Sequence, residues 1–324
     1  MERNITLDYT KLILSFLVVA IHIPVFWEYK LFSNLIANGL CRIAVPCFFV
    51  LNGLYLDKVL NDYTFFKKYI KKLFTFYLVW MLIYAPFYLF NYKDDLITSI
   101  LLNVSNIVFG FWHLWYIIGL IGAVMCLHYL KKRNINDSKL LYLSIILFLI
   151  GWLVQKIELF YPNMEGLLGG IIRSSFPTRN FIFMGFPFVT IGYLLSKDNF
   201  KQNLKKILTN KYVLIFLFLL LFVETTLHFF MIGRRGFDFY LSLIVLCPAL
   251  ILYLLKHSKI KMVKDDFISK LSSSLYFIHP LVLYLIKEAY PDFLATEQYI
   301  FIIFFSIVFG SALIYTNKSL KIFF

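Results

Sequence analysis

Long apolar stretches recur along the chain and are separated by short polar segments. A membrane-spanning helix needs about 20 mostly apolar residues, and stretches of that kind occur at about ten places. The expected spans are residues 9–27, 35–56, 73–90, 111–130, 140–155, 179–195, 212–230, 238–255, 272–288 and 298–316. The pattern therefore predicts an all-α protein that crosses a membrane about ten times.

A further apolar periodicity lies between the third and fourth expected spans. Its apolar positions recur at helical spacing with polar residues between them, which predicts a short helix lying on the membrane surface. These positions are Leu96, Ile97, Ile100, Leu101, Val104, Ile107 and Val108.

The composition supports a single membrane domain over residues 1–324. Apolar residues make up 60% of the chain and charged residues 15%, whereas roughly 25% of an ordinary soluble domain is charged. No polar linker or charge-rich block of domain size interrupts the sequence. We therefore expect no separate soluble domain within it.

Basic residues are concentrated in alternate connections between the expected spans. If the N-terminus is cytoplasmic, most of the 32 lysines and arginines fall in inner segments, as the positive-inside rule requires. This orientation places both termini in the cytoplasm. It also explains the net charge of +14 by basic loops that face anionic lipid, so no nucleic-acid partner is expected.

The first span carries a stripe of polar side chains. Asp8, Lys11, Ser15 and His22 are spaced so that they fall within an arc of roughly 60° on a helix. Ionisable groups inside a span are costly and usually face the protein interior or a water-filled cavity. The stripe favours a functional site over polar residues that only satisfy one another.

The second span contains Asn38 and Arg42 one helical turn apart, followed by Pro46 and Asn52. An arginine in a span must be paired or hydrated. Arg42 is therefore a candidate functional cation, and the alternative is an arginine that extends to the outer surface.

Other candidates stand at the ends or along the faces of later spans. His113 lies between Trp112 and Trp115, and Arg179 begins the sixth span. Glu224 and His228 are one turn apart and form either a structural pair or part of a cavity lining. Ser272, Tyr276 and His279 share one helical face. No metal site is expected from these residues.

Taken in order, these motifs resemble the membrane-bound acyltransferase family 3, which includes bacterial surface-polysaccharide O-acetyltransferases. The resemblance spans roughly residues 7–285. It rests on Leu7–Tyr9 with Ile21 and His22, on Arg42–Gly53, on Trp112–Tyr116, on Thr178–Phe181 with Gly185 and Gly192, and on Ser274–Pro280.

Two positions depart from the family pattern. The family usually has arginine where Lys11 stands, and lysine cannot make the same bidentate contact with a phosphate or carboxylate. The second-helix signature commonly ends in Ser-Gly, whereas this chain has Asn52 and Gly53. Both changes bear on donor binding more than on the reaction class.

The resemblance implies transfer of an acyl group, acetyl as the first expectation, from cytoplasmic acyl-CoA to a hydroxyl of an extracytoplasmic or lipid-linked glycan. It implies a bacterial plasma-membrane enzyme with no permanently bound cofactor. His22, Arg42 and His113 would be catalytic, with histidine as the base and arginine stabilising the oxyanion. The substrate-binding set would be Asp8, Lys11, Ser15, Asn38, Asn52, Arg179, Glu224, Tyr276 and His279.

Two other classes of function remain open at this point. A secondary transporter of an anionic sugar or lipid would also use buried arginine and histidine. A non-catalytic partner in polysaccharide export would keep the fold and need none of the histidines.

The alternation of basic segments predicts which positions each side of the membrane can reach. Cysteine labelling at positions 61, 135, 205 and 262 should report the cytoplasm, and labelling at positions 95, 163, 235 and 293 should report the outside. If positions 163 and 205 were labelled from the same side, the sixth span and the orientation of all later spans would be wrong.

Overall fold

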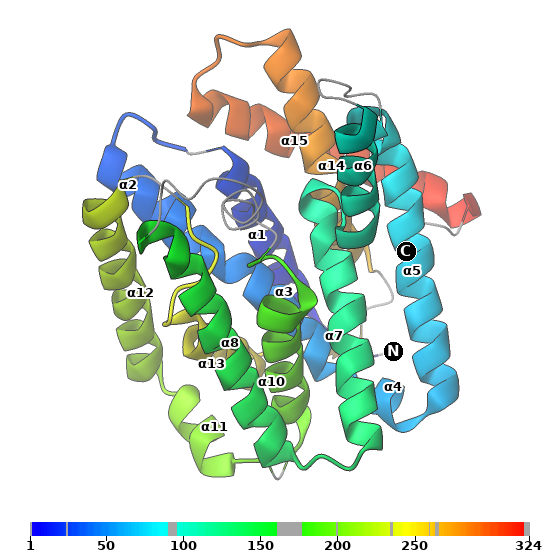
Figure 1. Ribbon diagram of the computed structural model, residues 1–324, viewed down its shortest axis with the longest axis vertical. Coiled ribbons are helices and arrows are strands. Elements are labelled where there is room, and N and C mark those ends of the chain that lie inside the picture. Colours follow the sequence, from blue (N-terminus) through cyan, green and yellow to red (C-terminus); the bar gives the residue numbers. More distant parts are fainter. Residues whose placement is uncertain are drawn as a thin grey trace. The chain divides into compact units, whose positions relative to one another are not determined.

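The computed structural model describes residues 2–23, 25–89, 96–160, 177–198, 200–233, 236–258, 260–262 and 266–320 (Figure 1). Helices and short connections make up this part of the chain, apart from one pair of three-residue strands. The chain divides into two compact units, Met1–Phe48 with Asp198–Phe324, and Phe49–Lys197.

The first unit combines the N-terminal and C-terminal helices. Strand β1 (Glu2–Asn4) pairs antiparallel with β2 (Ile260–Met262), so the N-terminus is joined to the segment between α13 and α14, next to α1. The helical elements are α1 (Ile5–His22), α2 (Lys30–Asn34), the π-helical turn η1 (Leu35–Gly39), the 3₁₀ turn η2 (Leu40–Ile43), α11 (Gln202–Leu208), α12 (Lys211–Ile232), α13 (Leu243–Lys256), α14 (Phe267–Ala289) and α15 (Ala295–Leu320).

The second unit follows in sequence after Phe48, where α3 (Ala44–Leu54) passes from one unit into the other. Its further helices are α4 (Asp57–Asn61), α5 (Tyr63–Leu89), α6 (Leu96–Phe109), the 3₁₀ turn η3 (Trp112–Leu114), α7 (Trp115–Lys132), α8 (Asp137–Phe160), the π-helical turn η4 (Phe181–Gly185) and α10 (Phe186–Ser196).

Every expected span overlaps a helix, and among the described residues seven helical segments are long and apolar enough to cross a membrane. They are Ile5–His22, Lys30–Leu54, Tyr63–Leu89, Trp112–Lys132, Asp137–Ile157, Lys211–Ile232 and Ala295–Lys318. The apolar helices Ser99–Phe109, Phe181–Ser196 and Leu243–Lys256 are shorter. The all-helical class is confirmed, whereas the count of about ten crossings and the cytoplasmic termini stay predictions.

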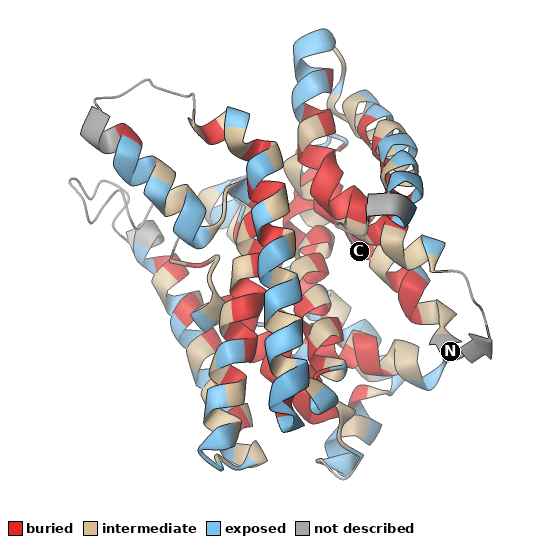
Figure 2. Cartoon of the chain, turned by 90° about the vertical axis from the view of Figure 1, so that its right-hand side faces the viewer, coloured by how far each residue is buried: buried red, intermediate tan, exposed pale blue. Residues whose placement is uncertain are grey.

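Large apolar side chains are exposed along many of these helices, and Figure 2 shows exposed positions following the outer faces of single helices. On α12 they form a continuous face of Ile215, Phe216, Leu219, Leu220, Val223, Leu227 and Phe230. An apolar face of this size would be unfavourable in water. It suits contact with lipid tails, as expected for an integral membrane protein.

Two segments differ from the expected boundaries. The predicted eighth span begins at residue 238, but α13 begins only at Leu243 and residues 236–242 are not helical apart from a turn. The second span starts earlier, at Lys30, and passes through η1 and η2 before α3. The predicted helix before the fourth span forms as α6. Most of the connection between the fifth and sixth expected spans lies outside the described residues.

Buried apolar contacts hold α1, α14 and α15 together in the first unit. Leu271 and Leu275 of α14 pack with Ile314 of α15, and Leu12 and Phe16 of α1 pack against this cluster. The Asn4 side chain caps α1 by accepting a hydrogen bond from the backbone N–H of Leu7 at 3.2 Å. The polar stripe of α1 therefore lies on a helix whose start and packing are both defined.

A close helix crossing organises the second unit. A Cβ atom added at Gly53 of α3 would overlap the carbonyl oxygen of Val189, and one added at Gly192 of α10 would overlap the carbonyl oxygen of Val50. The two backbones thus touch at paired glycines, as at small-residue crossings between membrane helices. Gly53, part of the second-helix motif, is required here by packing.

This crossing predicts a strong effect of a single methyl group. Gly53→Ala should lower the stability of the folded protein by about 1–3 kcal/mol, because neither backbone can give way to a Cβ. Thermal unfolding of detergent-purified protein measures the effect. The matched control is Gly119→Ala, where the added Cβ would lie 3.3 Å from Cζ of the Phe49 ring, which can shift. Equal melting temperatures for the two variants would contradict the prediction.

Candidate functional site

The polar stripe of α1 meets polar groups near the start of α14. The Ser15 hydroxyl lies 2.8 Å from the carbonyl oxygen of Ser272 and 2.9 Å from its hydroxyl. Both serines are buried, so these contacts replace hydrogen bonds to water. They fix the register of α1 against α14, and they give Ser15 a structural partner.

Two turns further along the same helices, two histidines lie against each other. The ring centroids of His22, the last residue of α1, and His279 are 5.3 Å apart at an interplanar angle of 32°. His279 is fully buried, and the Tyr276 ring contacts it edge-on at 6.2 Å. The predicted face of α14 therefore brings its histidine to the end of the predicted stripe on α1.

The hydrogen bond of His279 determines which ring nitrogen is basic. Its Nδ1 lies 3.0 Å from the carbonyl oxygen of Leu275. Because a carbonyl oxygen can only accept, Nδ1 carries the hydrogen in the neutral ring and Nε2 holds the lone pair. The backbone of α14 thus fixes the tautomer of this histidine.

At the start of the stripe, the Lys11 ammonium lies 3.7 Å from the Asp8 carboxylate, one helical turn away. Asp8 is buried and about a quarter of the Lys11 side chain, 28%, is exposed. An ion pair of this kind keeps a buried carboxylate compensated. Lys11 therefore already has an ionic partner in Asp8, although the exposed part of its side chain can still contact a ligand.

Arg42 stands at the centre of a second polar cluster in the same unit. It lies on η2, which packs against α1. Its Nη1 donates to Asp238 at 2.7 Å and its Nη2 donates to Asn38 at 2.9 Å. Only 9% of the side chain is exposed, so Arg42 is a buried, paired cation and does not extend to the surface.

The cluster continues through two asparagines. Asn38 donates to the Asn34 side chain at 2.9 Å, and Asn34 donates to the carbonyl oxygen of Thr225 on α12 at 3.4 Å. Both asparagines are buried. The chain of amides explains why η1 and α12 remain in contact around the guanidinium.

The sequence did not single out Asp238 or Asn34. Asp238 precedes the apolar run of α13 and belongs to no periodic face, so helical spacing gave no reason to select it. One signal could have found Asp238. It is an acidic residue at the edge of an expected span, and the arginine in the second span needs an acidic partner.

Glu224 and His228 both hold the segment 236–242, which carries Asp238. The Glu224 carboxylate accepts hydrogen bonds from the backbone N–H of Leu241 at 2.7 Å and from the N–H and hydroxyl of Ser242 at 3.1 and 3.0 Å. The His228 ring contacts the rings of Phe237 and Tyr240, each at 5.1 Å. Glu224 therefore satisfies backbone groups at the start of α13.

The remaining predicted residues belong to the second unit. His113 is buried on η3 with the edge of its ring against Tyr84, at a centroid distance of 5.0 Å. Asn52 donates to the Tyr116 hydroxyl at 2.7 Å. Arg179 is half-buried in the turn that leads into η4. His113 and Asn52 thus contact residues of the second unit.

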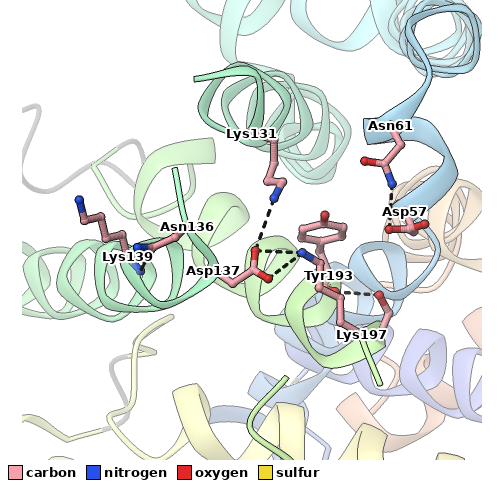
Figure 3. Close-up of polar contacts among 9 residues, drawn as sticks. Asp57, Asn61, Lys131, Asn136, Asp137, Lys139, Tyr193 and Lys197 are labelled. Atoms are coloured by element: carbon pink, nitrogen blue, oxygen red, sulfur yellow. Dashed lines mark hydrogen bonds and ion pairs between the residues drawn. The ribbon is translucent and has the colours of Figure 1, made fainter. Parts of the chain in front are cut away.

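A further charged cluster joins the ends of α7, α8 and α10 (Figure 3). The Asp137 carboxylate accepts from Lys197 at 2.7 and 2.9 Å and from Lys131 at 3.5 Å. Burial lowers the pKa of Lys197, but hydrogen bonds to Asp137 and Tyr193 outweigh it, so the pKa is raised above its usual value. Two basic residues of predicted inner segments are therefore tied to a carboxylate.

These positions define a multi-helix membrane protein with a His–His contact, in which the His279 ring is buried, and a buried arginine cluster in the same unit. The family model described as an acyltransferase domain matches residues 4–316, and the chain belongs to this family. In the described residues, no three His, Cys, Asp or Glu side chains gather as metal ligands would.

The similar proteins are longer than this chain. One is a serine/alanine racemase of Enterococcus gallinarum, 31% identical over 296 residues, or 86% of this chain and 40% of the relative. Another is an amino-acid racemase of Enterococcus faecalis, 28% identical over 299 residues, or 87% of this chain and 41% of the relative. The chain thus spans about two fifths of the length of these relatives. No solved structure matches.

Proposed function

We propose that this protein is an O-acyltransferase of the bacterial plasma membrane. It moves an acyl group from cytoplasmic acyl-CoA to a hydroxyl of an extracytoplasmic or lipid-linked glycan, and acetyl is the acyl group that we propose. Membership of the acyltransferase family supports the reaction class. The observation that carries the proposal is the contact between His22 and His279 at the end of the polar line on α1 and α14.

A sugar hydroxyl does not attack a thioester efficiently without a base near neutral pH. In the proposed step His22 takes the hydroxyl proton as the oxygen attacks the thioester carbonyl carbon. A C–O bond forms and the carbonyl oxygen becomes an oxyanion. The intermediate then collapses with cleavage of the C–S bond, and the leaving CoA thiolate recovers the proton from the imidazolium.

Arg42 is proposed to stabilise the oxyanion. A buried guanidinium already held by Asp238 and Asn38 needs no reorganisation as charge develops on the substrate. Tyr276 and His279 would hold the His22 ring in place. His113 remains a catalytic candidate, and Asn52 and Arg179 remain binding candidates, on the family resemblance alone.

The first prediction of this proposal concerns His22 and Arg42. His22→Ala should reduce glycan acylation about 10²–10⁴-fold because the base is lost, and Arg42→Ala about 10²–10³-fold because an oxyanion donor is lost. Mass spectrometry of surface glycans, from cells with equal amounts of membrane-inserted protein, measures both effects.

His128→Ala and His257→Ala are the matched controls. The His128 ring stacks on Phe66 at 3.9 Å and the His257 ring stacks on Tyr253 at 4.5 Å, so neither belongs to the His22 contact. Both variants should acylate at nearly the normal rate. Wild-type acylation by His22→Ala would remove the catalytic assignment.

The second prediction concerns Lys11 as a contact for the CoA phosphates, which need dense positive charge. Lys11→Ala should weaken CoA binding, and Lys11→Arg should largely preserve it. Calorimetry with CoA on the purified protein measures the affinity.

Because Lys11 also pairs with Asp8, the double variant Asp8→Asn with Lys11→Ala separates the two roles. It leaves no unpaired carboxylate, so a purely structural role predicts recovery of CoA affinity. A direct contact with CoA predicts that the affinity stays low. Full affinity in Lys11→Ala itself would exclude Lys11 from the donor site.

Transport of an anionic sugar or lipid remains the second candidate function. The relatives are named as amino-acid racemases, and this chain matches about two fifths of each, so an amino acid is a further small molecule to test. Uptake of labelled serine by proteoliposomes, without any acylated product, would favour transport over acyl transfer. A non-catalytic role in polysaccharide export would leave acylation independent of His22.

A further inference from the structure

The hydrogen bonds of Arg42 leave one nitrogen of the guanidinium for a ligand. A guanidinium donates from three nitrogens, Nε, Nη1 and Nη2. Nη1 donates to Asp238 and Nη2 donates to Asn38, whereas the buried Nε–H has no hydrogen-bond partner among the residues that the structure describes. A buried donor without an acceptor is costly. An acceptor brought by a substrate would satisfy it.

The charge of the cluster restricts which acceptor fits. The Arg42 guanidinium and the Asp238 carboxylate, 2.7 Å apart, form a neutral pair. A donor that already carries a negative charge before reaction would have to share the guanidinium with Asp238, and that carboxylate would repel it. A carbonyl oxygen, which is neutral in the substrate and gains negative charge only during reaction, fits the Nε–H better.

The position of Asp238 is fixed by the segment around it. At Gly236 an added Cβ would overlap Nη2 of Arg42 and would lie 2.8 Å from the Asn38 side-chain oxygen, so the backbone lies directly on the guanidinium. Phe239 is fully buried, and Glu224 binds the backbone of Leu241 and Ser242. Asp238 is thus held beside Arg42 and is not placed to yield to an incoming anion.

We propose that Asp238 is a specificity-determining and positioning residue, which keeps Arg42 neutralised and oriented so that its Nε–H donates a hydrogen bond to the carbonyl oxygen of an uncharged acyl group. The inference rests on the proposed function and deepens it. Acetyl and other neutral acyl groups would be accepted, and acidic acyl groups such as succinyl would be rejected. The protein would thus select acyl groups by their charge, and this selection is separate from any limit on acyl length.

Two four-carbon donors test charge without changing length, namely butyryl-CoA and succinyl-CoA. Purified protein in nanodiscs receives each donor together with an envelope glycan extract of the producing bacterium, and release of the CoA thiol gives kcat/KM. The wild type should prefer butyryl-CoA at least tenfold. Asp238→Asn should reduce this preference on the order of tenfold, because it removes the carboxylate and keeps the shape.

Two variants serve as controls. Asp238→Glu keeps the negative charge and should keep the preference for the neutral donor. Asp292→Asn makes the same chemical change at an exposed position of the same unit and should behave like the wild type. A preference that falls equally in Asp292→Asn would overturn the assignment of Asp238.

The outcomes separate this inference from the function on which it rests. Equal use of both donors by the wild type would overturn the inference even if Asp238→Asn failed to fold, while acyl transfer itself would stand. An unchanged preference in folded Asp238→Asn would do the same. Release of CoA from neither donor by the wild type would refute acyl transfer, and the inference with it.

Discussion

The cost of an unpaired charge in an apolar environment governs the arrangement of the first unit. Arg42 is buried to about nine tenths of its side chain, and its charge is compensated by Asp238 from a part of the chain 196 residues away. Breaking a buried ion pair typically costs about 3–5 kcal/mol. The segment 236–242 must therefore return to η2, and the amides of Asn34 and Asn38 extend this requirement to α12.

The same constraint applies to backbone groups. Away from water, an irregular segment is tolerated only where its N–H and C=O groups find partners. Residues 236–242 leave the helical pattern before α13, and the Glu224 carboxylate accepts the N–H groups of Leu241 and Ser242 there. Glu224 thus makes the non-helical segment possible, and the segment in turn delivers Asp238 to Arg42.

Sequence periodicity predicts contacts within one helix face better than contacts between distant segments. The stripe on α1 and the face of Ser272, Tyr276 and His279 follow from spacing alone, and the two meet through Ser15 and His22. The pairing of Arg42 with Asp238 could not be predicted, because no periodicity links a residue on a 3₁₀ turn with one in a non-helical segment. Glu224 and His228 were correctly placed one turn apart, but their partners lie in segment 236–242, which sequence spacing does not indicate.

The contact between His22 and His279 also limits how the proposed reaction handles protons. With ring centroids 5.3 Å apart and one ring fully buried, a second positive charge beside the first would be repelled. Two imidazolium cations side by side are therefore disfavoured. The proposed acyl transfer needs only one imidazolium, because the proton taken from the hydroxyl would return to the CoA thiolate in the same turnover. The His–His contact thus suits a reaction in which one proton is taken up and released within the turnover, with no net proton uptake.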